Sequence, residues 1–122
     1  MAYIMSVSRT LITVAETPLF IRQAEAVWDE AEREAFVNFI AASPEAGDVI
    51  PETGGVRKIR WARAGSGKRG GARVIYFFHA ASRPLYLLMV YAKGHQEDLS
   101  PGEKRTVRKL AAILKGAGKK ER

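Results

Sequence analysis

The chain has 122 residues, of which 47% are hydrophobic and 27% charged, and it contains no cysteine. This length and composition predict one soluble globular domain with a buried core. Without cysteine, disulfide bonds and thiolate metal sites are excluded, and His79 and His95 share no local metal-binding motif, so we expect no metal and no cofactor. No apolar run approaches the roughly 20 residues that cross a bilayer. Residues 1–10 lack the pattern of a signal peptide, so a cytoplasmic protein without membrane contact is expected.

Acidic and basic residues are segregated along the chain. Residues 1–52 contain three basic and nine acidic side chains, residues 53–93 contain nine basic and none acidic, and residues 94–122 contain eight basic and four acidic. A solvated surface is the ordinary explanation of a charge run. A stretch of 41 residues without a carboxylate instead favours a face that binds a polyanion. A phosphate-rich partner is therefore predicted.

The N-terminal part of the chain predicts one strand and two helices. Its β-branched residues 10–14 are typical of a strand. Thr17 before a proline is typical of a helix N-cap, and it predicts a helix over residues 18–27. Asp29 with Glu32 three residues later forms a capping-box pattern, which predicts the start of a second helix.

The C-terminal part predicts three strands and a last helix. The three runs rich in β-branched and aromatic residues are 56–62, 72–80 and 85–93, after a connector at 47–55. Ser100 and Glu103 form a second capping box, and the helix that follows is predicted to end at Gly116. Its apolar face consists of Val107, Leu110, Ala111 and Leu114.

The predicted order is therefore β-α-α-β-β-β-α. Short connections between consecutive strands favour a mostly antiparallel four-stranded sheet with the helices packed on one face, which is an α+β fold. We expect the domain to span residues 10–116, with residues 1–9 as an N-terminal extension and residues 117–122 as a basic C-terminal tail.

The segment GSGKRGG, at residues 65–71, has the G-x-G-x-x-G spacing of a dinucleotide-binding loop. Such a loop precedes a helix whose N-terminus binds the pyrophosphate, whereas the segment ARVIYFF that follows here is typical of a strand. A P-loop has Ser or Thr after its lysine, and Arg69 follows Lys68. Both nucleotide-binding hypotheses are therefore excluded. The segment instead predicts a glycine-rich connection between strands. It is either an ordinary solvated loop or a basic loop that contacts phosphate.

Alternation along the strands predicts a cationic surface beside this loop. Lys58 and Arg60 point to one side of their strand, and Ile59 and Trp61 point to the other. If the neighbouring strands pair with matching faces, one concavity contains Lys58, Arg60, Arg73, Tyr91 and Lys93. Cations in such a cluster neutralise phosphate and can stabilise a pentacoordinate transition state.

The aromatic residues near this surface have two possible roles. Tyr91 or Trp61 could stack on unpaired bases, while plain core packing is the preferred explanation for Trp61 and Phe77. His79 and His95 are weaker candidates for a general base.

The segment GGVRKIRWARAGSGKRGGARVIYFF followed by LYLLMVYAKGHQEDLSPGEK resembles the RelE/ParE superfamily of toxins from type II toxin–antitoxin modules, most closely the HigB-like branch of RelE-type toxins. The resemblance covers roughly residues 10–115. It implies a RelE-like fold and a ribosome-dependent endoribonuclease that cuts messenger RNA and inhibits translation. The implied reaction is attack of a 2′-hydroxyl on the adjacent phosphate without a metal.

The resemblance also implies roles for particular residues. The implied catalytic residues are Lys58, Arg60, Arg73 and Lys93, with Arg73 and Lys93 on the scissile phosphate and Lys58 or Arg60 assisting proton transfer. The residues expected to bind RNA are Arg57, Arg63, Lys68, Arg69 and Tyr91. The aromatic residue that RelE has after its last strand is replaced here by Leu99 and Ser100.

The implied partners are the ribosome, messenger RNA and a cognate antitoxin, expected to be a helix-turn-helix protein. Two alternatives keep the same fold. One is a ParE-like toxin that inhibits gyrase and has no nuclease activity. The other is a non-catalytic module that binds RNA or the ribosome through the same basic surface.

Overall fold

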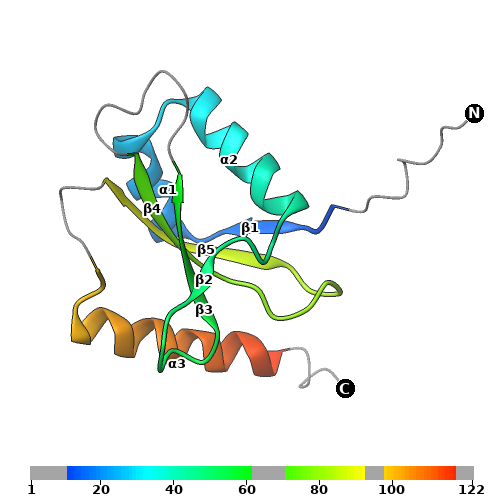
Figure 1. Ribbon diagram of the computed structural model, residues 1–122, viewed down its shortest axis with the longest axis vertical. Helices are drawn as coiled ribbons and strands as arrows, with labels where there is room; N and C mark the ends of the chain where they lie inside the picture. Colours follow the sequence, from blue (N-terminus) through cyan, green and yellow to red (C-terminus); the bar gives the residue numbers. More distant parts are fainter. Residues whose placement is uncertain (1–10, 62–70, 93–97, 118–122) are drawn as a thin grey trace, which may run out of the picture.

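The computed structural model describes residues 11–61, 71–92 and 98–117. Its elements follow the order β-α-α-β-β-β-β-α (Figure 1). They are β1 (Val14–Glu16), α1 (Pro18–Val27), α2 (Glu30–Ala42), β2 (Asp48–Val49), β3 (Val56–Trp61), β4 (Ala72–Phe77), β5 (Leu85–Ala92) and α3 (Pro101–Ala117). Among the described residues, no helix is both long and apolar enough to cross a membrane.

The strands form one mixed sheet in the order β1-β5-β4-β3-β2. The pairs β2–β3, β3–β4 and β4–β5 are antiparallel, whereas β1 pairs with β5 in parallel. The prediction of a mostly antiparallel α+β sheet is thus correct, but its number of strands is wrong. The additional strand, β2, is two residues long and lies inside the segment predicted to be a connector.

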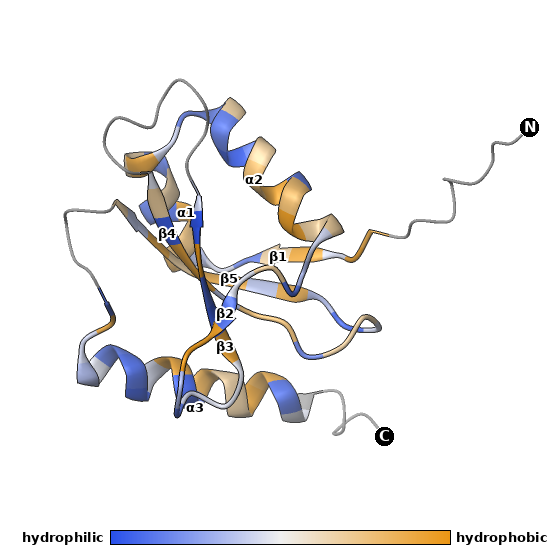
Figure 2. Cartoon of the chain, viewed as in Figure 1, coloured by the Kyte–Doolittle hydropathy of each residue, from blue (hydrophilic) through white to orange (hydrophobic). Residues whose placement is uncertain are grey.

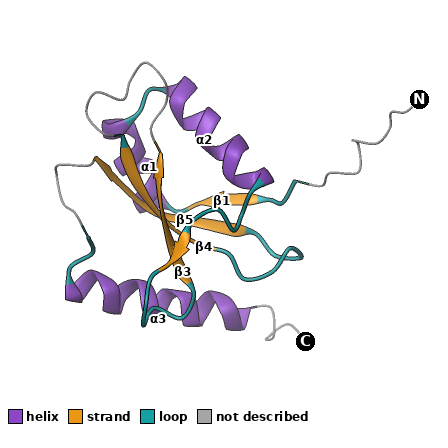
Figure 3. Ribbon diagram, in the orientation of Figure 1, coloured by secondary structure: helices purple, strands orange, loops and turns teal. Residues whose placement is uncertain are grey.

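Helices cover both faces of the sheet, and the prediction of helices on one face is wrong (Figure 3). Phe20 of α1 and Phe36 of α2 pack with one set of strand side chains, including Val74 of β4. Val107 of α3 packs with the other set, including Ile75 of β4. Because adjacent strand residues point to opposite faces, the two cores lie on opposite sides of β4. Figure 2 shows the hydrophobic residues along the strands between the helix layers.

The predicted helix starts are confirmed by their capping contacts. The Phe20 amide donates to the hydroxyl of Thr17, 3.3 Å away, and Thr17 also donates to the Leu87 carbonyl at 2.9 Å. Asp29 and Glu32 form the reciprocal capping box of α2, with backbone-to-carboxylate distances of 2.8 and 3.2 Å. Ser100 and Glu103 form the capping box of α3. The Glu103 amide donates to the Ser100 hydroxyl at 3.1 Å, and the Ser100 amide donates to the Glu103 carboxylate at 2.9 Å. Unlike the prediction, α3 continues through Gly116 to Ala117.

A bulge interrupts the pairing of β4 with β5. Ile75 pairs with Met89 while Tyr76 pairs with Leu87, which leaves Leu88 as the extra residue. An extra residue reverses which side chains point to which face. Leu87 therefore packs with α1 and α2, whereas Tyr91 lies on the α3 side.

Tyr76 joins the sheet to the segment between α2 and β3. Its buried hydroxyl donates to the Pro44 carbonyl at 2.9 Å and accepts from the Gly47 amide at 2.8 Å. Arg57 donates to the carbonyls of Gly47 and Glu45 at 2.7 and 3.2 Å. These bonds hold β2 beside β3, where Asp48 pairs with Lys58.

We predict that Tyr76→Phe lowers the free energy of unfolding at pH 7 by about 1–3 kcal/mol, because it leaves the buried Gly47 amide and the partly buried Pro44 carbonyl without the hydroxyl. Burial raises the pKa of Tyr76, so the folded chain keeps this proton at pH values where the unfolded chain loses it. Stability contributed by the hydroxyl is then lost as pH rises beyond about 10. Urea unfolding at pH 7 and above pH 10 measures both effects, and the difference between wild type and variant should shrink in alkali.

Tyr86→Phe is the matched control, since Tyr86 is only half-buried. It should change the free energy of unfolding little at either pH. Equal stability of Tyr76→Phe and wild type would contradict the role assigned to the Tyr76 hydroxyl.

Candidate functional site

A row of polar side chains crosses three adjacent strands on the α3 side of the sheet. Arg60 of β3 pairs with Arg73 of β4, and Arg73 pairs with Tyr91 of β5. Lys58 lies two residues before Arg60 on the same face. Two arginines directly opposite each other repel and destabilise a sheet. An anion near the two side chains would offset this repulsion, so the row is a candidate anion-binding surface.

Lys58 forms an ion pair at this surface. Its Nζ lies 2.5 Å from Oδ1 of Asp98, which immediately precedes the buried Leu99 at the start of α3. The side chain of Asp98 is 73% exposed and that of Lys58 is 33% exposed. The hydrogen bond from Lys58 is the main cause that lowers the pKa of Asp98, and the charges of Lys58, Lys104 and Arg73 lower it further. Asp98 therefore lies in the positive field of three separate elements.

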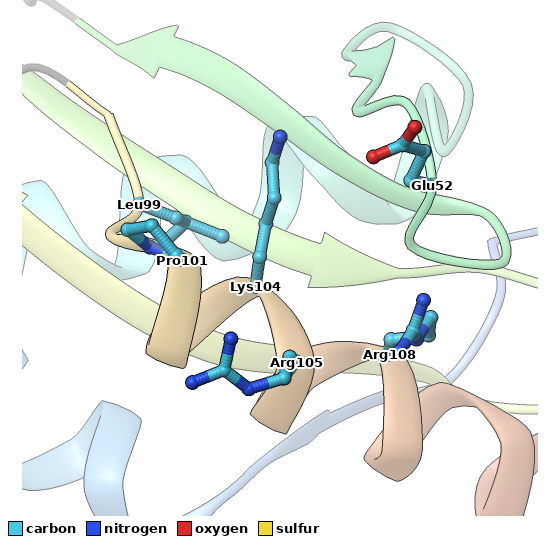
Figure 4. Close-up of a pocket in the computed structure, with 6 residues that line it drawn as sticks. All are labelled: Glu52, Leu99, Pro101, Lys104, Arg105 and Arg108. Carbon is cyan, nitrogen blue, oxygen red and sulfur yellow. The ribbon is translucent and has the colours of Figure 1, made fainter.

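Two surface hollows adjoin this ion pair. The first, of about 310 Å³, is lined by Lys58, Asp98, Lys104 and residues 48–51 with Leu99. The second, of about 290 Å³, is lined by Glu52, Leu99, Pro101, Lys104, Arg105 and Arg108 (Figure 4). Figure 4 shows Lys104 extending from α3 toward the strands, with Glu52 on a facing turn. Lys104 lines both hollows and so links the sheet surface to the basic side of α3.

One side-chain nitrogen of Arg73 is buried although the residue as a whole is partly exposed. The residue is partly exposed, but its Nη1 atom is buried and has no hydrogen-bond partner within the described part of the chain. An unmet buried donor destabilises the free protein.

Several residues predicted to act together are placed elsewhere or are not described. Arg57 lies on the opposite face of β3 from Lys58, where it binds the carbonyls of Glu45 and Gly47, so the structure does not bring it to the cationic row. The remaining predicted residues, Arg63, Lys68, Arg69 and Lys93, lie outside the described residues.

Trp61 and Phe77 pack against the hydrophobic core, which is the role predicted for them. Trp61 packs between Phe36 and Phe39, with ring centroids 5.3 and 5.0 Å away, and Phe77 is buried. Tyr91 is buried on the α3 side, at 4% exposure, so little of its ring is available for stacking on a base in this conformation. His79 is exposed beyond the end of β4, and its ring stacks on Phe77. Arg73, near the start of β4, lies at the other end of that strand.

Sequence patterns do not single out Asp98 or Lys104. The one signal for Asp98 is that, with Glu97, it is the first carboxylate after residue 52. Lys104 follows the capping-box Glu103 and is one of several cations on α3. Within the described residues, no group of three or more His, Asp or Glu side chains is placed to hold a metal ion.

Comparisons with known proteins bear on the family and the fold of the chain. The family model described as the RelE toxin of the RelE/RelB toxin–antitoxin system matches residues 24–121. Among solved structures, a free-state structure of a double-arginine mutant of the E. coli toxin RelE is similar, with a TM-score of 0.52 and 14% sequence identity over 72% of this chain and 90% of that chain. At that identity the structural match supports the fold, and the family match covers most of the chain. The chain therefore belongs to the RelE toxin family.

Proposed function

We propose that this toxin is a messenger-RNA endoribonuclease that acts on the ribosome and inhibits translation. The observation that supports this most is the row of Arg60, Arg73 and Tyr91, with Lys58 on the same face. Convergent cations suit a reaction whose transition state gains negative charge on phosphate. Family membership independently supports a toxin of a toxin–antitoxin system.

The proposed chemistry needs no metal. A 2′-hydroxyl loses its proton to a base and attacks the adjacent phosphorus, so that a P–O2′ bond forms. The P–O5′ bond then breaks, and the leaving oxygen takes a proton, which gives a 2′,3′-cyclic phosphate and a 5′-hydroxyl. Arg73, together with Lys93, stabilises the phosphoryl oxygens. Lys58 or Arg60 assists proton transfer.

The proposed partners follow from the same assignment. The ribosome presents the messenger RNA, and a cognate antitoxin, proposed to be a helix-turn-helix protein, neutralises the toxin. The basic side of α3, with Arg105 and Arg108 exposed, lies next to the site and suits contact with RNA phosphates.

We predict that inducing the protein in a translating extract produces new RNA ends within translated codons. The upstream fragments should end in a cyclic or 3′-phosphate, because the attacking group is the 2′-hydroxyl. Sequencing of RNA ends measures this. Purified messenger RNA without ribosomes should remain intact, which tests ribosome dependence.

Two results would replace the nuclease proposal. Inhibited translation with no new RNA ends would favour a binding module that contacts RNA or the ribosome. Growth arrest with unaffected translation and altered DNA supercoiling would favour a gyrase inhibitor.

A further inference from the structure

Asp98 is a carboxylate in the middle of a cationic surface. It contacts Lys58 directly, and the charges of Lys104 and Arg73 also act on it. These three cations come from β3, α3 and β4. Lysine and arginine bind carboxylate and phosphate oxygens through the same charge-assisted hydrogen bonds. The Asp98 carboxylate, bound by one cation and in the field of two others, therefore lies where a negative charge is favoured.

Lys104 lies at the edge of both hollows. Within the described part of the chain it forms no ion pair, although it lines the hollow that contains Lys58 and Asp98. It also lines the second hollow, beside Arg105 and Arg108 (Figure 4). An ammonium group at the junction of both hollows can move toward an anion in the first without breaking a bond of its own.

The shape of the surface favours an anion larger than a carboxylate. Asp98 accepts from Lys58 through one of its two carboxylate oxygens. A phosphodiester has two non-bridging and two ester oxygens around one phosphorus. With more acceptor oxygens than a carboxylate, it can accept hydrogen bonds from more than one of these cations.

We propose that the position of the Asp98 carboxylate is the phosphate subsite of the toxin, and that Lys104 is a phosphate ligand there together with Lys58 and Arg73. That the phosphate is part of substrate RNA rests on the proposed function. Asp98 is then an internal competitor, which the incoming phosphate displaces from Lys58. Most of its surface is exposed, so it can swing into solvent without disturbing the core.

The test measures affinity with a substrate that cannot react. A fluorescein-labelled 2′-O-methyl oligoribonucleotide lacks the attacking hydroxyl, and fluorescence anisotropy gives its Kd. Asp98→Asn should bind about twofold to fivefold more tightly than wild type, the range expected for release of a mostly exposed ion pair. Lys104→Gln should bind more weakly and lower the slope of log K against log salt by about one.

The two changes should also depend on each other. In a Lys104→Gln background, the gain from Asp98→Asn should be smaller, because one of the ligands that the phosphate would use is missing. Glu34→Gln, on the exposed side of α2, removes the same charge in a layer on the other face of the sheet and is the control. It should change the Kd little.

Inorganic phosphate provides a second measurement that needs no RNA. Titration followed through the backbone amide signals of Leu99 and Ser100 should saturate at a lower phosphate concentration in Asp98→Asn than in wild type. Saturation at the same or a higher concentration would overturn the subsite. So would an equal gain in RNA affinity from Glu34→Gln, or an unchanged affinity in Lys104→Gln.

The competing role for Asp98 is to position Lys58 for catalysis. In that case Asp98→Asn would lower the cleavage rate at saturating RNA without increasing affinity, and this result would also overturn the proposal. Failure of the proposed function looks different. Wild type would then produce no new RNA ends, while the affinities of the unreactive oligonucleotide and of phosphate would still follow the predicted order.

Discussion

Replacing Arg73 with alanine is expected to lower the rate of RNA cleavage about 100- to 1,000-fold, the effect of removing one preorganised donor to a developing oxyanion. Arg73 lies at the centre of the cationic row, paired with Arg60 on one side and Tyr91 on the other. The residue is partly exposed, so a substrate can reach part of its side chain. Expression of the variant should no longer arrest growth. RNA-end sequencing and growth curves measure the two effects.

The fold should survive this change, because removal of Arg73 also removes the repulsion with Arg60. Thermal unfolding of purified protein checks this. Arg73→Lys, which keeps the charge but not the planar fork of donors, should recover only part of the activity. Arg22→Ala, an exposed arginine on α1, is the matched control and should remain toxic. Growth arrest by Arg73→Ala as strong as that of wild type would disprove the proposed site.

Gly47→Ala is expected to lower the free energy of unfolding by about 2–5 kcal/mol, through overpacking and the loss of buried hydrogen bonds. A Cβ atom at this position would lie 2.9 Å from the Lys58 carbonyl oxygen and 2.9 Å from both Cε1 and the hydroxyl oxygen of Tyr76. The strand backbone and a fully buried ring cannot both move away. The Gly47–Tyr76 hydrogen bond should break, and β2 should separate from β3.

Urea unfolding monitored by circular dichroism measures this loss. The control is Gly116→Ala on α3, where a Cβ would meet nothing within 4 Å. That change should be neutral or stabilise the protein by up to about 1 kcal/mol. Because the clash includes the Lys58 carbonyl, Gly47→Ala should also lower toxicity at temperatures where the protein is still folded. Unchanged stability would show that the connector is not held as the structure indicates.

The parts of the fold that the sequence predicts are those with local causes. The helix starts at Thr17, Asp29 and Ser100 depend on a side chain and a backbone amide three residues apart. Such contacts are visible in any short segment. The antiparallel strands β3, β4 and β5 are predicted for the same reason, since alternation and short connections are local.

The errors concern contacts between distant segments. Whether α3 covers the same face as α1 and α2 depends on the path of the chain after β5, and no local pattern records it. The parallel pairing of β1 with β5 joins Val14 to Leu85, and nothing near either residue specifies this partner. The strand β2 is too short to have a periodicity and exists because Tyr76 and Arg57 hold its backbone in place.

The sequence predicted which residue types form the candidate site better than it predicted where they lie in space. Charge and alternation are enough to group Lys58, Arg60 and Arg73. Tyr91 is different, because the bulge at Leu88 decides its face. Strict alternation from Leu87, which packs with α1 and α2, would place Tyr91 on that side too. Asp98 and Lys104 reach the site only because α3 begins beside β3, which depends on tertiary packing.

The parallel pairing of β1 with β5 has a consequence for synthesis of the toxin. Thr17 at the start of α1 bonds to Leu87, 70 residues later, so β1 and the start of α1 lack this sheet partner until β5 has left the ribosome. Contacts of such long sequence separation form slowly, because the intervening chain must be ordered first. The cations of the site lie between residues 58 and 104, so they also assemble late. Under the proposed function, we therefore expect a nascent chain to be inactive until nearly the whole domain has been released.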